Sequence, residues 1–261
     1  MQGQAVKHIS FGEGIIKNVS GRFITICFAQ GDKKFLYPDA FSRFLKLKDA
    51  EKQKELEEKN KQRMTKKKAE RKKEQERRWK IYTMKIVPNS QAAFHIEFQD
   101  AENIVECGRV STGCYLSGAS KGNPRIPRRL KPNSVCLITG LPKDKEERNR
   151  RILGAFMVKG DFLGEYCEDG IVKGHEQYKV YLHSDETLPF WDYFKHDETF
   201  PRWGNVPFKY FSNTTMQKIL SDITKLLAGT TQEAVVHEFY QYFCKLNHLS
   251  AEPTNQGDAV K

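Results

Sequence analysis

At 261 residues the chain is long enough for one or two domains, each able to bury a hydrophobic core. Only 38% of the residues are hydrophobic while 30% are charged, a balance that is low for one compact globule and indicates a solvated insert. The excess of 44 Lys and Arg over 33 Asp and Glu gives a net charge of +11, which favours polyanionic partners, although solubility alone also accounts for such a charge.

Neither export nor membrane insertion is indicated by the sequence. The first residues show no charged segment followed by an apolar one, and no apolar run reaches the roughly 18 residues that a membrane span needs. The six cysteines form no CxxC pair, and Cys27 and Cys136 lie in apolar runs, where a free thiol behaves as a small hydrophobic group. We therefore expect a reduced, cytoplasmic protein without a zinc site.

Residues 1–45 predict a small module of β-strands. Short apolar, β-rich runs alternate with turns at Phe11–Gly14, Ser20–Gly21 and Gln30–Asp32. Several short strands at this spacing form a meander that can close as an SH3-like barrel. The expected strands cover residues 4–9, 14–19, 22–28 and 33–37.

A motif within this module resembles a known family. The pattern Val6-x-His8-x-x-Phe11-Gly12-x-Gly14-x-Ile16, followed by Ile24-x-Ile26-x-Phe28 and Gly31-x-Lys33-x-Phe35, is similar to the Tudor/KOW-like barrel at the C-terminus of UvrD-like helicases. The resemblance implies docking on RNA polymerase or on nucleic acid. The alternative is that His8, Phe11 and the glycines serve only the core and turns of the barrel.

Residues 46–80 predict one long helix with a strong positive charge. The segment holds sixteen Lys or Arg and eight Asp or Glu, so it carries +8 of the total +11. It lacks Gly and Pro and is rich in good helix formers, and pairs such as Glu55–Lys59, Glu57–Lys61, Glu74–Arg78 and Glu76–Lys80 are spaced to interact. Its scarce apolar residues predict a solvated helix without a coiled-coil seam.

Two functions fit this helix. The first is a spacer between two domains. The second is contact with phosphates, because residues 61–73 hold eight basic residues and one acid. The phosphate-contacting side chains are then expected to be Lys66, Lys67, Lys68, Arg71, Lys72 and Lys73.

Residues 81–249 predict a second, α+β domain, followed by a disordered tail at 250–261. Its centre is a pair of strands buried on both faces, Ser134–Thr139 and Ile152–Val158, with Gly154 where a bulge or a close backbone approach is expected. Further strands are expected at 92–98, 178–182 and 208–211. Two amphipathic helices are expected at 215–227, capped by Asn213 or Thr214, and at 232–246.

This second domain resembles PUA-like barrels of the EVE, ASCH and YTH kind. The resemblance rests on the central strand, a charged loop with Glu146-Glu-Arg148, and the strand Ile152-Leu-Gly-Ala-Phe156. It implies nucleic-acid binding and an aromatic pocket for a modified base, with Arg125, Arg128 and Arg129 on phosphates beside it. The implied pocket residues are Tyr115, Ser117, Trp191, Tyr193, Phe194 and Trp203; packing in the core is the alternative for both tryptophans.

No motif indicates catalysis. The seven histidines are scattered, without metal-ligand spacing or a cysteine at the spacing of a nucleophile and its base. A nuclease site around His196, with Asp192, Asp197 and Glu198, is the weaker alternative, because charges that gather on a polar loop are usually only solvated.

We therefore expect a small SH3-like β-barrel, a long basic solvent-exposed helix and a PUA-like barrel with flanking helices. The expected function is nucleic-acid binding, to DNA or RNA, without catalysis, cofactor or metal. The resemblance to PUA-like domains further implies a reader of a modified base. The alternative from another class is a protein-interaction adaptor whose barrel docks on a polymerase- or helicase-like partner.

Overall fold

The computed structural model describes residues 1–183, 186–194 and 202–251. The chain forms two compact units, Met1–Arg78 and Trp79–Lys261, and its fold class is α+β, as expected. No helix among the described residues has the length and apolar character needed to cross a bilayer. The expected disordered tail falls mostly on residues 252–261, which lie outside the described residues.

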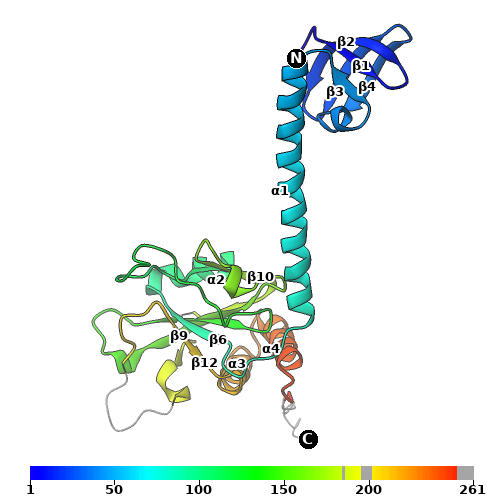
Figure 1. Ribbon diagram of the computed structural model, residues 1–261. Helices are drawn as coiled ribbons and strands as arrows, with labels where there is room; N and C mark the ends of the chain where they lie inside the picture. The colour runs from blue at the N-terminus through cyan, green and yellow to red at the C-terminus, as the bar shows by residue number, and fades with distance from the viewer. Residues whose placement is uncertain (184–185, 195–201, 252–261) are drawn as a thin grey trace, which may run out of the picture. The chain divides into compact units, whose positions relative to one another are not determined.

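The first unit is built on a curled antiparallel sheet (Figure 1). Alternation along Phe23–Phe28 places Ile24 and Ile26 in the core, where Val6 and Ile16 meet them. Gly21 has a φ of 56° and allows the tight turn into that strand. The sheet order is β4-β3-β2-β1-β5, with strands β1 Ala5–His8, β2 Gly12–Ser20, β3 Phe23–Phe28, β4 Gly31–Leu36 and β5 Leu45–Leu47, and a 3-10 turn at Asp39–Ser42.

The boundary expected after residue 45 is corrected, because it cuts through β5. That strand pairs with β1, so the sheet extends to Leu47. Helix α1, Ala50–Tyr82, then packs its first turns against the same unit. The Gln53 side-chain oxygen accepts a hydrogen bond from the Leu47 amide at 2.8 Å, Leu56 is 9% exposed in the core, and the Asn60 side chain donates to Ser42 Oγ.

The remaining turns of α1 are exposed, as the sequence predicts. Two of the expected ion pairs form, Lys59 with Glu55 at 2.5 Å and Arg78 with Glu74 at 3.1 Å. The other two expected pairs do not form as predicted. Glu57 instead accepts a hydrogen bond from the Gln53 side chain at 2.5 Å. Lys80 instead lies 3.0 Å from Glu165 of the second unit.

The second unit is organised around a mixed sheet. The strands β6 and β8 are parallel, and the other pairs are antiparallel. Its order is β12-β6-β8-β9-β10-β7, with β11 paired to β9; the bounds are β6 Gln91–His95, β7 Arg109–Ser111, β8 Val135–Gly140, β9 Arg151–Val158, β10 Ile171–Tyr181, β11 Leu188–Pro189 and β12 Phe208–Phe211.

Both faces of this sheet are covered, which confirms the prediction for the two central strands. All six residues of β8 are buried. Helices α3, Asn213–Leu226, and α4, Glu233–Asn247, cover one face, and α2, Ala101–Cys107, covers the other (Figure 1). Gly154 behaves as predicted: the pairing register shifts beside it, and a Cβ there would lie only 2.6 Å from the Val180 carbonyl oxygen.

Several local boundaries differ from the sequence-based expectation. The strand expected at 92–98 ends at His95, and a 3-10 turn begins at Phe98. Helix α3 begins at Asn213 because Ser212 is its cap, with Ser212 Oγ accepting from the Thr215 amide at 3.0 Å. Asn213 or Thr214 was expected to be that cap; instead the buried side chain of Asn213 joins a polar network with Gln91.

Candidate functional site

The basic stretch of α1 is the most strongly charged surface of the first unit. All residues from 61 to 73 are exposed, including the six predicted phosphate contacts. Among the described residues, no carboxylate forms a salt bridge with Lys66, Lys67, Lys68 or Arg71, whereas Lys72 lies 3.9 Å from Glu76. Because successive helical residues are about 100° apart, these cations surround the helix. The stretch therefore offers positive charge in every direction rather than on one face.

Of the four aromatic residues predicted in the C-terminal part of the base pocket, three come together as packing around Phe190. Ring centroids of Trp191, Phe194 and Trp203 lie 5.0, 4.6 and 5.6 Å from that of Phe190. Tyr193 donates a hydrogen bond to Asp222 on α3 at 3.0 Å, and burial together with this carboxylate raises its pKa. These contacts belong to the core under α3.

Trp203 is a core residue, which corrects its assignment to a base pocket. It is 4% exposed, and its indole N–H donates to the Val206 carbonyl at 2.7 Å. Trp191 is half-buried and donates to the Glu147 carbonyl at 2.8 Å. With its N–H bonded to the protein and its ring enclosed, Trp203 has no face left for a base.

A buried arginine covers one face of Trp203. Arg150 is 2% exposed, and its guanidinium carbon lies 4.2 Å from the centre of the Trp203 ring. The Nε and Nη2 atoms of Arg150 lie 2.5 and 3.0 Å from the two carboxylate oxygens of Glu147. Its Nη1 lies 3.0 Å from Nδ1 of His95 and 3.3 Å from Thr139 Oγ1.

The contact with Arg150 determines the state of His95. A guanidinium only donates, so Nδ1 of His95 must be the unprotonated, accepting nitrogen. Burial, and then the charge of Arg150, lower the pKa of His95. The sequence contains one signal for this arrangement, a Glu and an Arg three residues apart immediately before a buried strand, and our sequence analysis missed it.

Tyr115 and Ser117 lie on a different part of the second unit, the loop of residues 112–131. Among the described residues, no ring contact or hydrogen bond joins them to the Trp203 group. The loop is held at its base, where Thr112 Oγ1 donates to the Arg125 carbonyl at 2.6 Å and the Gly164 amide donates to the Leu130 carbonyl at 2.8 Å. Its ends are thus fixed by the core, while Ser117 is exposed at its tip.

Two arginines of this loop stack on tyrosines. The guanidinium carbon of Arg125 lies 4.9 Å from the ring centre of Tyr115, and that of Arg129 lies 5.1 Å from the ring centre of Tyr210. The backbone N–H of Arg129 also donates to the Tyr210 hydroxyl at 3.4 Å. Burial raises the pKa of Tyr210, while the hydrogen bond from the Arg129 backbone and the charge of Arg129 lower it.

The charged residues in the sequence of this loop are all basic. Residues 107–143 contain no Asp or Glu and seven basic residues. Arg128, the third predicted phosphate contact, is exposed between the two stacked arginines in sequence. This acid-free segment was a sequence signal for the loop, whereas Tyr210 was missed because it lies 81 residues from Arg129. The basic residues are Arg109, Lys121, Arg125, Arg128, Arg129, Lys131 and Lys143.

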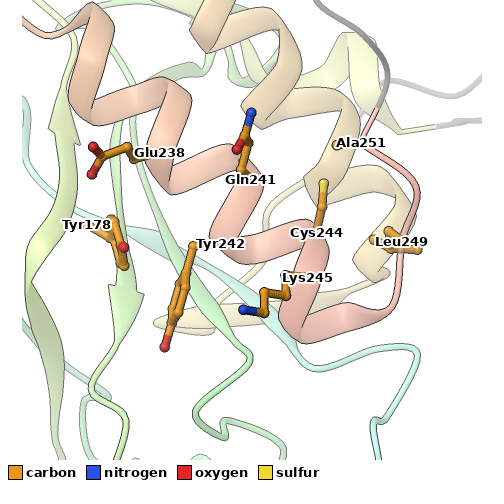
Figure 2. A pocket seen from close by; sticks show the side chains of 8 residues that line it. All are labelled: Tyr178, Glu238, Gln241, Tyr242, Cys244, Lys245, Leu249 and Ala251. Carbon is orange, nitrogen blue, oxygen red and sulfur yellow. The ribbon is translucent and has the colours of Figure 1, made fainter.

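A groove of about 610 Å³ lies along α4 (Figure 2). Figure 2 shows Tyr178 of β10 beside Tyr242 of α4, and their ring centroids are 4.6 Å apart in a stacked arrangement. Glu238 and Lys245 both line the groove, so its charges oppose each other. Nothing about its charge selects a polyanion.

The nuclease alternative receives no support from the residues that are described. His196, Asp197 and Glu198 lie outside the described residues, and Asp192 belongs to a 3-10 turn at Phe190–Tyr193. Within the part of the chain that the structure covers, no group of three or more His, Cys, Asp or Glu side chains is placed to hold a metal ion.

Comparison with known proteins finds no protein-family model, no curated protein and no solved structure that matches the chain.

Proposed function

We propose that this protein binds nucleic acid without catalysis and that the basic stretch of α1 contacts the phosphate backbone. The observation that carries the proposal is the exposure of eight basic residues at 61–73. Five of them, Lys61, Lys66, Lys67, Lys68 and Arg71, have no salt bridge among the described residues, whereas Arg63 and Lys72 do. A spacer helix needs no such excess, because balanced Glu and Lys pairs stabilise a solvated helix equally well. Cations that are not already paired are free to replace the counterions of a polyanion.

The finer fold assignments remain part of this proposal. The first unit has the strand number and curl of an SH3- or Tudor-like barrel, and the second has a mixed sheet with flanking helices, as a PUA-like domain would. All six cysteines are free thiols, which supports a reducing, cytoplasmic setting.

The test is the salt dependence of binding. The logarithm of the affinity falls with the logarithm of salt concentration by about 0.9 per neutralised phosphate on duplex DNA and about 0.7 on single strands. Replacing Lys66, Lys67 and Lys68 by Gln should therefore reduce the slope by roughly 2 to 3 if each contacts a phosphate.

A matched control exists in the same helix. Lys52, Lys54 and Lys59 are also exposed, but they are interleaved with acids, and two of them form ion pairs with Asp49 and Glu55. Replacing these three by Gln removes the same charge and should leave the slope nearly unchanged. If the two triple variants lower the slope equally, the effect is one of net charge and not of contact by residues 66–68. If the unaltered protein does not bind nucleic acid at low salt, the proposal is refuted.

The adaptor function is a second candidate because the first unit has two grooves beside its 3-10 turn, the larger of which is mainly apolar. Their volumes are about 490 and 370 Å³, and Phe44 lines both. Ile9 is 75% exposed in one groove and Met64 is 52% exposed in the other. If the unit docks on RNA polymerase, the double change Ile9→Ser and Phe44→Ser should abolish binding of the purified polymerase while leaving nucleic-acid affinity unchanged.

A further inference from the structure

We infer that the loop of residues 112–131 and strand β12 form a stacking platform for unpaired bases, which makes single-stranded nucleic acid the preferred substrate class. This inference rests on the proposed function and deepens it. It concerns the second unit alone. In place of the buried Trp203, it assigns base stacking to residues that remain accessible. The platform consists of Tyr115, Arg125, Arg129 and Tyr210.

Each tyrosine ring has an arginine guanidinium over its face. Tyr115 and Arg125 are partly exposed, Arg129 is exposed, and Tyr210 is partly buried against Phe208, whose ring lies 5.3 Å away. A flat cation over an aromatic face is attracted by the ring quadrupole and loses much of its rotational freedom. The outer face of each guanidinium is then available to a further flat group.

The guanidinium groups also retain unused donors. Arg125 Nε donates to the Cys114 carbonyl at 3.2 Å, and no other hydrogen bond occupies the side chains of Arg125 and Arg129 among the described residues. Arginine carries five N–H donors in one plane. A base stacked on this plane can therefore be accompanied by in-plane hydrogen bonds to a phosphate or a base edge, a combination that lysine cannot provide.

The requirement for base faces selects single strands. In a duplex, each base is already stacked on its neighbours, so its faces are covered, whereas unpaired bases can splay onto aromatic rings and guanidinium planes. Two exposed apolar side chains flank the platform: Leu116 is 71% exposed and Ile126 is 37% exposed. Such side chains fit the apolar faces of bases better than a phosphate backbone.

Phosphates of the same strand have partners nearby. Lys121 and Arg128 are exposed on the same loop, and residues 107–143 contain no Asp or Glu. The loop is also preorganised: the Tyr115 amide donates to the Asn123 carbonyl at 3.0 Å, and the Arg125 amide donates to the Gly113 carbonyl at 2.8 Å. Little ordering entropy is therefore lost when a strand binds.

The experiment measures binding of the full chain by fluorescence anisotropy to four oligonucleotides of one sequence, namely single-stranded DNA, single-stranded RNA and the two corresponding duplexes. The decisive variant combines Arg125→Lys and Arg129→Lys, which keep the charge and remove the plane. Loss of base stacking should weaken single-strand binding by about tenfold or more, with an unchanged salt slope and unchanged duplex affinity. Unequal losses for DNA and RNA would identify the strand that the platform prefers.

A second variant guards against a folding artefact. Tyr115→Leu removes the ring under Arg125 at a partly exposed position, and its melting temperature is measured beside its affinity. The inference is overturned if both variants bind single strands like the unaltered protein, or if single-strand and duplex affinities fall equally. In either case, the salt slope of the α1 variants still tests the proposed function separately. If the unaltered protein binds none of the four oligonucleotides, the proposed function and this inference both fail.

Discussion

Removing Arg150 should destabilise the second unit far more than removing a neighbouring arginine. In Arg150→Met, the Glu147 carboxylate, whose side chain is only 24% exposed, loses both hydrogen bonds from its partner, and Nδ1 of His95 loses its donor. Breaking a buried pair by removing one member costs about 3–5 kcal/mol. Because Glu147 retains some contact with water, we expect the lower end, about 3 kcal/mol.

The matched control is Arg148→Met. Arg148 lies 2.9 Å from Glu146, but both side chains are more than half exposed, at 61% and 68%. A surface pair of this kind contributes roughly 0–1 kcal/mol. In a unit of this size, 1 kcal/mol shifts the melting temperature by roughly 2–4 °C, so the Arg150 variant should melt about 6–12 °C lower and the control nearly unchanged.

The assay is thermal and urea denaturation followed by tryptophan fluorescence, since Trp203 lies against Arg150 and reports on this region directly. The double variant Arg150→Met and Glu147→Leu should recover part of the loss, because no charge is then left unpaired. Equal small losses for Arg150→Met and Arg148→Met would refute the argument that burial makes this pair important.

Three further outcomes are expected. Burial and Arg150 lower the pKa of His95 below its usual 6.5, so the unfolded chain takes up the proton at a higher pH than the folded one. The free energy of unfolding should therefore fall as the pH drops below about 6.5. The variant His95→Gln should flatten this dependence in urea titrations at several pH values. At pH 8, iodoacetamide should modify the exposed Cys107 and Cys114 first. Cys167 should react only on unfolding, since burial raises the pKa of its thiol to about 11. Mass spectrometry of the labelled peptides checks the order. Calorimetry should resolve two unfolding transitions, one for Met1–Arg78 and one for Trp79–Lys261, because each unit has its own core; a single cooperative transition would contradict this.

Sequence pattern alone determined the parts of the fold that depend on neighbouring residues. The α1 helix follows from a long run of helix formers without Gly or Pro, and strands β8 and β9 follow from continuous apolar runs. The apolar face of α3 was also predicted correctly, since Met216, Ile219 and Ile223 are fully buried. Such features repeat with a short period, so a window of ten to twenty residues contains the information.

Tertiary structure alone decided which polar and aromatic side chains are accessible. Trp203 is buried between Arg150 and Phe190, and Tyr210 lies under the guanidinium of Arg129 because β12 pairs with β6 at the edge of the sheet. The first turns of α1 are likewise partly buried because they contact β5 and the 3-10 turn. Burial depends on contacts between segments far apart in the chain, and the free energy of those contacts is not encoded in any local pattern of residues.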